Sequence, residues 1–127
     1  MVARILSGLG LLAALSIPVA AAPCGAPVGQ AVVLKSGELD PDVFVWDTKQ
    51  RVIDYASGRW GDTHAVLQHT MLAKPGTRAV IVQCGAGQVR RDGTDARDAI
   101  GIRLVNGPNK GRYGWVTSDD VHEVAIR

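Results

Sequence analysis

The pattern of apolar and polar positions changes along the chain, and each change marks a different part of the protein. The first part is an almost unbroken apolar run over residues 5–17. Two short apolar runs follow, Ala31–Leu34 and Val43–Trp46, and we expect at least the second to be a strand, because its residues are β-branched or aromatic. A helix-like period then covers residues 48–72, and a period of two returns after Gly76.

Two short helices are predicted in the middle part. Thr48 can cap the first helix, and Gly58 stands where that helix would stop. Its apolar face would consist of Val52, Ile53 and Tyr55. The second helix would begin at Asp62 or Thr63 and end before Lys74, with its inward positions at Val66, Leu67, Thr70 and Met71. Because both helices are short, tertiary packing must hold them in place.

The remaining chain predicts strands joined by turns. We expect a buried strand over residues 78–84, a long polar loop over 85–98, and a hairpin formed by 99–105 and 112–117. A single helical turn at 118–121 would lead into a last strand at 121–126. Alternation predicts that one face of these strands forms the core, made by Val80, Val82, Ile102, Leu104 and Val116.

The N-terminal run has the three parts of a signal peptide. Arg4 supplies the positive charge, the apolar segment is shorter than the roughly 20 residues a spanning helix needs, and small residues surround the expected cut after Ala21. A lipidated Cys24 is the alternative, but Pro23 stands where a lipobox has a small residue. We therefore predict a signal peptide over 1–21, one domain over 22–127, and a periplasmic or secreted location.

The two cysteines, Cys24 and Cys84, are expected to form a disulfide, since an even count in an exported chain favours pairing. Closure of a loop of about 60 residues would contribute about 4 kcal/mol in the loop-entropy model. A catalytic thiol at one of these positions is the alternative, and it would leave the other cysteine unpaired.

The C-terminal stretch carries a resemblance to a known family. A strand over 100–105 leads into a Gly107–Gly111 hairpin, returns through Gly114-Trp115-Val116, and continues into a short turn before Val121. This arrangement resembles the C-terminal half of bacterial SH3-like domains, and residues 74–82 resemble the strand before it. The resemblance implies a mainly β fold, a small SH3-like β-barrel, here with a short helical insertion between the first and second barrel strands. It implies no particular function, because small barrels have many roles.

Charge and histidine spacing favour neither nucleic-acid binding nor a metal site. Removal of residues 1–21 takes away Arg4 and leaves 13 Lys and Arg against 12 Asp and Glu, a net charge of +1. A nucleic-acid partner would need a clustered basic surface. His64 and His69 are five residues apart, which places them on different faces of a helix, and His122 stands in a solvated turn region. We expect no metal, no cofactor, no nucleic acid and no stable membrane anchor.

Candidate binding residues are few. Trp60 stands between glycines next to Arg59, in the segment that this chain adds to the barrel, and Arg91 and Arg97 stand on the predicted long loop. Aromatic and arginine side chains are typical anchors of binding sites, although the sequence favours a Trp60 that packs the helices onto the barrel over a Trp60 that binds a ligand. The sequence favours a non-catalytic binding module for a cell-envelope component, either peptidoglycan or an envelope protein. A small secreted hydrolase or hydrolase inhibitor, and a purely structural envelope protein, are the alternatives.

Overall fold

The computed structural model of the chain describes residues 27–37, 42–59 and 63–124. The predicted signal peptide at 1–21, together with Cys24 and Trp60, lies outside the described residues. What the sequence predicts for them, including the Cys24–Cys84 disulfide and the Trp60 anchor, therefore stays a prediction.

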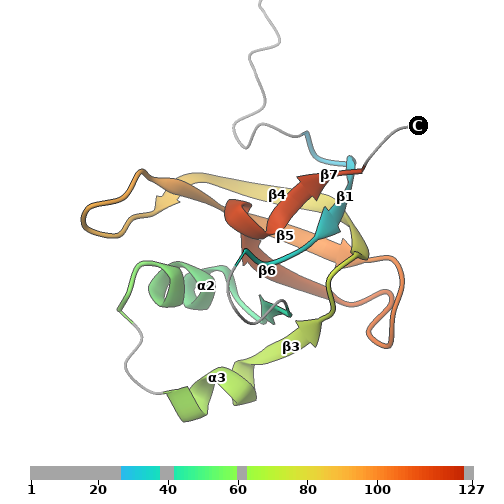
Figure 1. Cartoon of the computed structure of the whole chain (residues 1–127), viewed down its shortest axis with the longest axis horizontal. Coiled ribbons are helices and arrows are strands. Elements are labelled where there is room, and N and C mark those ends of the chain that lie inside the picture. Colours follow the sequence, from blue (N-terminus) through green and yellow to red (C-terminus); the bar gives the residue numbers. More distant parts are fainter. Residues whose placement is uncertain (1–26, 38–41, 60–62, 125–127) are drawn as a thin grey trace, which may run out of the picture.

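The fold is mainly β, a seven-stranded antiparallel sheet that curls into a half-barrel and carries two short helices (Figure 1). The strand order is β3-β2-β6-β5-β4-β1-β7. The strands are β1 (Ala31–Leu34), β2 (Val43–Trp46), β3 (Thr70–Ala73), β4 (Thr77–Val89), β5 (Arg97–Leu104), β6 (Tyr113–Thr117) and β7 (Val121–Glu123). The helices are α2 (Lys49–Ala56), α3 (Thr63–His69) and the 3₁₀ turn η1 (Ser118–Asp120). Both predicted N-terminal strands and the turn at 118–120 are confirmed.

Helix α2 begins and ends where the sequence predicts. The Thr48 hydroxyl accepts a hydrogen bond from the backbone N–H of Arg51 at 3.2 Å, which satisfies one of the unpaired donors of the first turn. Gly58 follows the last turn with a φ of 80°, a conformation that favours glycine. Val52 and Ile53 are buried beneath the helix.

The second helix is shorter than predicted, and two of its expected inward residues are not in it. Thr70 and Met71 belong to β3, which pairs with β2 over its whole length. The prediction that Leu67 points inward is also wrong, because its side chain is 69% exposed, whereas Val66 is buried. Hydrogen bonds to β2 satisfy the backbone N–H and C=O groups of residues 70–73. If α3 continued for one more turn, these hydrogen bonds to β2 would be lost.

The core is made by one face of the strands, but in β4 the expected parity is wrong. Ile102 is buried as predicted, and so are Leu104 and Val116. Ala79 and Ile81 join them in place of the predicted Val80 and Val82, which are only half-buried. The register explains this, because Ala79 lies opposite Leu104 and Ile81 opposite Ile102, and directly opposed residues share a face.

The predicted long loop over 85–98 is also wrong. Strand β4 continues to Val89 and β5 begins at Arg97, so the connection is only residues 90–96. Two register shifts interrupt the β4–β5 ladder, one on each side of the Gln83–Gly85 stretch. The Asp98 carboxylate accepts a hydrogen bond from the backbone N–H of Gly87 at 2.8 Å. Glycine and polar residues thus continue a bulged strand here instead of ending it.

A second apolar cluster fixes the helices to the other face of the sheet. Ala99 belongs to it, while the adjacent Ile100 belongs to the first core, because successive residues of a strand point to opposite faces. The buried members are Trp46, Val52, Ile53, Val66, Val89 and Ala99. Both helices therefore lie on one side of the sheet, and the β4–β5 hairpin extends past α2 (Figure 1).

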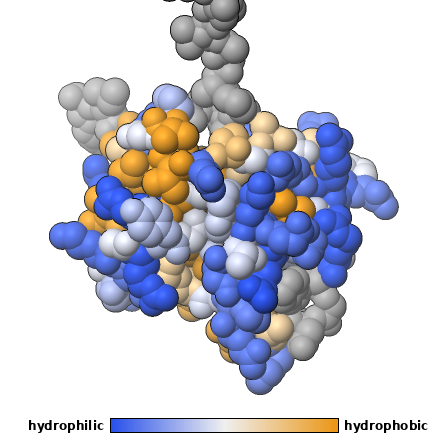
Figure 2. Space-filling model, turned by 180° about the vertical axis from the view of Figure 1, so that it is seen from behind, coloured by the Kyte–Doolittle hydropathy of each residue, from blue (hydrophilic) through white to orange (hydrophobic). Residues whose placement is uncertain are grey.

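The large apolar side chains that the structure exposes come from separate elements: Val28, Tyr55, Leu67, Leu72 and Tyr113. Seen from behind, the surface has a hydrophobic area bordered by hydrophilic residues (Figure 2). Within the described ranges, no helix is both long and apolar enough to span a bilayer.

Candidate functional site

A cleft of about 900 Å³ lies between the C-terminal end of α2, the residues on either side of 38–41, the β4–β5 hairpin and η1. Its described lining residues are Ser36, Gly37, Asp42, Phe44, Trp46, Val52, Tyr55, Ala56, Gly58, Arg91, Arg97, Thr117, Asp119 and Asp120. The volume is within the range of small-molecule sites, and the lining combines apolar side chains with a few charged ones.

Three aromatic rings form the apolar part of the cleft. Trp46 is buried, and the Tyr55 ring packs against it with 5.0 Å between the ring centroids. Phe44 meets Tyr55 edge-on at 6.1 Å. Tyr55 is 40% exposed, so this ring is held in place on one side and open to solvent on the other. Such a ring offers a rigid contact surface at low entropic cost.

Arg97, a predicted site residue, joins two walls of the cleft. One Nη atom donates a hydrogen bond to the carbonyl oxygen of Ala56 at 3.1 Å, and the other donates to the carboxylate of Asp119. Its Nε is buried and has no hydrogen-bond partner within the described part of the chain. The side chain thus links the last turn of α2 to η1, and we assign it a positioning role.

Arg91, the second predicted residue in the cleft, lies at the α2 end. Its side chain passes over Gly58, where a Cβ atom would lie 3.4 Å from the Arg91 Nε. Such a Cβ would make only ordinary van der Waals contact with Arg91, so the φ of 80° and not the space is what favours glycine at position 58. Unlike Arg97, Arg91 is an exposed residue.

The other two predicted residues do not form part of the described site. Arg59 is exposed and pairs with Asp54 at 3.0 Å, and it does not line the cleft. Trp60 lies outside the described residues. The sequence missed Tyr55 and Asp119 as site residues, because the first looks like a core residue of a helix and the second like a polar residue of a turn.

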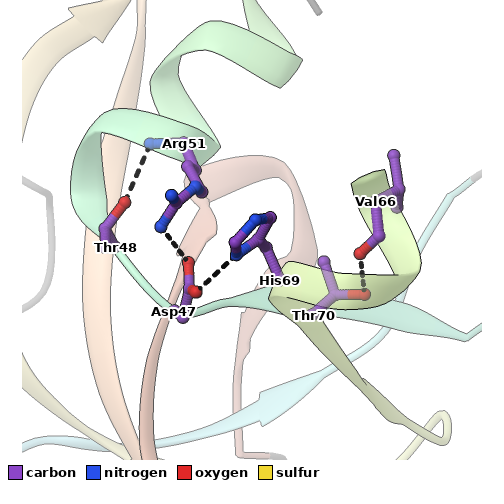
Figure 3. A network of polar contacts seen from close by, with 6 residues as sticks. All are labelled: Asp47, Thr48, Arg51, Val66, His69 and Thr70. Atoms are coloured by element: carbon purple, nitrogen blue, oxygen red, sulfur yellow. Dashed lines mark hydrogen bonds and ion pairs between the residues drawn. The ribbon is translucent and has the colours of Figure 1, made fainter. Parts of the chain in front are cut away.

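The start of α2 is tied to the end of α3 by an ionic network whose residues do not line the cleft (Figure 3). One oxygen of Asp47 accepts from the Arg51 guanidinium at 3.1 Å, and the other lies 2.9 Å from Nδ1 of His69. Burial raises the pKa of Asp47, but the hydrogen bonds from His69 and Arg51 outweigh this effect and hold the pKa below its usual value. The backbone N–H of Asp47 also donates to the carbonyl oxygen of His69.

The histidines have separate partners. His69 contacts Asp47, whereas Nε2 of His122 lies 2.9 Å from the carbonyl oxygen of Lys35. In the portion of the chain that the structure describes, no three His, Cys, Asp or Glu side chains come together as a metal site would require. Cys84 is half-buried in β4.

Comparison of the chain with protein-family models, curated proteins and solved structures gives no match.

Proposed function

We propose that the chain is an exported, non-catalytic binding domain that recognises a cell-envelope component, with peptidoglycan as the leading partner, in the cleft beneath α2. The observation that carries this proposal is the combination of a preformed aromatic wall with an exposed arginine in one cavity. Sites of this composition bind ligands through shape and a few polar anchors.

We further propose that the half-barrel is a variant of the SH3-like barrel. Supporting this, β4, β5 and β6 form an antiparallel meander, η1 follows β6, and β7 then pairs with β1. The chain between β1 and β4 would be the addition to the family's barrel. It contains two strands, β2 and β3, as well as the two helices, so it is more than the helical insertion the sequence predicts.

The addition supplies much of the cleft. Phe44 and Trp46 come from β2, and Tyr55 comes from α2. Arg91 and Arg97, by contrast, come from the β4–β5 hairpin. A partner in the cleft would therefore contact both the barrel and its addition, which gives this chain a site of its own on a common type of fold.

Retention on purified sacculi tests the proposal. The mature protein, beginning near Ala22, should sediment with protein-free sacculi, and Arg91→Ala should raise the apparent Kd about fivefold or more, with little change in Tm. Arg112→Ala is the matched control. Arg112 is exposed, and its carbonyl oxygen accepts a hydrogen bond from the N–H of Leu104 at the far end of β5. Leu104 is seven residues from Arg97, or roughly 20 Å along the strand.

The outcomes separate the possible partners. Binding to crude envelopes but not to protein-free sacculi would indicate an envelope protein. Clearing of the sacculus suspension would indicate a hydrolase and contradict the non-catalytic assignment. Equal retention of the Arg91→Ala and Arg112→Ala variants would mean that the cleft is not the binding face.

A further inference from the structure

We infer that the cleft takes a zwitterionic ligand, a short peptide or amino-acid-like group that presents a carboxylate and an ammonium on either side of an apolar segment. This inference rests on the proposed function, because it gives the ligand chemistry of the same cleft. Three features of the cleft carry it: opposite charges at its two ends, a fixed ion pair between them, and an aromatic wall.

The charges of the cleft are separated along its length. Arg91 lies at the Gly58 end, beyond the last turn of α2. Asp119 and Asp120 belong to η1, and the backbone carbonyl of Asp120 accepts from the N–H of Lys35, next to the β1–β2 connection. Arg91 thus stands at the Gly58 end and the η1 carboxylates at the other, while a third carboxylate, that of Asp42, also lines the cleft just before β2.

Arg97 fixes this separation. Its guanidinium bridges Ala56 of α2 and Asp119 of η1, so it lies between the two ends of the cleft. The positive charge of Arg97 is paired with the carboxylate of Asp119. Asp119 is still half-exposed, at 51% of its side chain. A carboxylate has two oxygens and about four acceptor positions, so Asp119 can bind Arg97 and an incoming ammonium together.

The aromatic wall determines what lies between the two charged groups. The exposed side of the Tyr55 ring and the edge of Phe44 offer apolar contact, whereas the Tyr55 hydroxyl can donate or accept a hydrogen bond, so the apolar part of this wall is the ring surface. A ligand segment lying there would be apolar, such as the Cα and methyl groups of a small residue.

A ligand with one kind of charge fits this cleft less well. A dianion would pair with Arg91, but its second negative charge would approach the η1 carboxylates. A dication would pair with those carboxylates, but its second positive charge would approach Arg91. Like charges placed together weaken binding, whereas a carboxylate at Arg91 and an ammonium at Asp119 are both charge-assisted hydrogen bonds. Complementarity to both ends therefore selects a zwitterion.

Alanine peptides of two, three and four residues are suitable probes, because each added residue separates the termini by about 3.3 Å. Each length is prepared with free termini, with an acetylated amine, with an amidated carboxylate, and with both blocks. Binding is measured by NMR titration of the mature protein. We expect one length with free termini to bind best, and each block to weaken it about tenfold.

Two charge-specific variants connect each end of the peptide to its residue. In the Arg91→Ala variant, amidation of the peptide should no longer weaken binding, whereas acetylation still should. Asp119→Asn keeps an acceptor for Arg97, and in this variant acetylation should no longer weaken binding, whereas amidation still should. Arg112→Ala and Glu123→Gln are the controls, since both are exposed and outside the cleft lining, and they should behave as the parent does.

The result can overturn the inference without reference to sacculi. Three outcomes would overturn it. The first is that blocking a terminus changes the Kd less than twofold. The second is that both variants still bind the blocked peptides as weakly as the parent does, and the third is that no NMR signal of a cleft residue shifts on titration. Peptide discrimination without sacculus retention would instead contradict the peptidoglycan assignment and leave the zwitterionic ligand standing. Sacculus retention without peptide discrimination would contradict only the ligand class.

Discussion

The substitution Gly114→Ala tests a close contact between two neighbouring strands, at the place where β2 pairs with β6. A Cβ atom at this position would lie 2.3 Å from Cγ1 of Val45 and 2.9 Å from the backbone oxygen of Trp46. Separations under 3.0 Å require something to shift. Val45 is only 1% exposed, so its side chain has little room to rotate, and the Trp46 oxygen moves only with β2 itself.

The expected cost follows from overpacking. Insertion of one methyl group into a packed core typically costs about 1–3 kcal/mol, and the backbone contact places this site at the upper end, about 3 kcal/mol. In a domain of about 100 residues this lowers Tm by more than about 10 °C. Thermal melting by circular dichroism and urea unfolding of the mature protein measure both quantities.

Gly37→Ala is the matched control, because no heavy atom lies within 4 Å of its added Cβ, and its stability should change by less than about 0.5 kcal/mol. The double variant Gly114→Ala/Val45→Ala removes one of the two clashing partners. Its cost should be smaller than the sum of the single costs by about 0.5 kcal/mol or more. If Gly114→Ala melts within about 2 °C of the parent, β2 does not pack against Gly114 of β6 as described.

Three further predictions concern the core and the ionic network. Ile102→Ala should cost about 2–5 kcal/mol in urea unfolding and Val80→Ala less than half as much; equal costs would refute the register of β4. Trp115→Ala should destabilise the fold by about 2–4 kcal/mol, because the half-buried ring packs against the second apolar cluster; a normal Tm would contradict this. Since the folded-state pKa of Asp47 is depressed, its stabilising effect is present above the usual value of 3.8 and is lost as the pH falls through the folded pKa. Asp47→Asn should therefore flatten the acid limb of stability against pH, and an unchanged limb would exclude this contribution.

The sequence by itself was sufficient for features that depend on neighbours in the chain. Thr48 and Gly58 mark the ends of α2 because a cap and a left-handed residue act within one helical turn. The alternation of Ile102 with Arg103 sets the inward face of β5. The hairpin into β6 and the turn at η1 follow from local turn residues in the same way.

Other features depend on the partner strand. The run from Ala79 to Val82 is apolar on both faces, so only the pairing with β5 decides which residues enter the core. The glycine-rich end of β4 looks like a loop until its backbone pairs with β5. Residues 70–73 have helix-compatible side chains, yet they form β3 because β2 offers them a hydrogen-bonded edge.

The cleft was decided almost entirely by tertiary structure. The sequence singles out Arg91 and Arg97 as candidates, but it cannot show that Arg97 is engaged with Ala56 and Asp119 while Arg91 is exposed. Nor does it indicate that Tyr55 stands on Trp46 at the cleft wall. Local patterns fix helix ends, turns and strand faces through short-range sterics and hydrogen bonds, whereas a site formed by four distant segments exists only once long-range packing has brought them together.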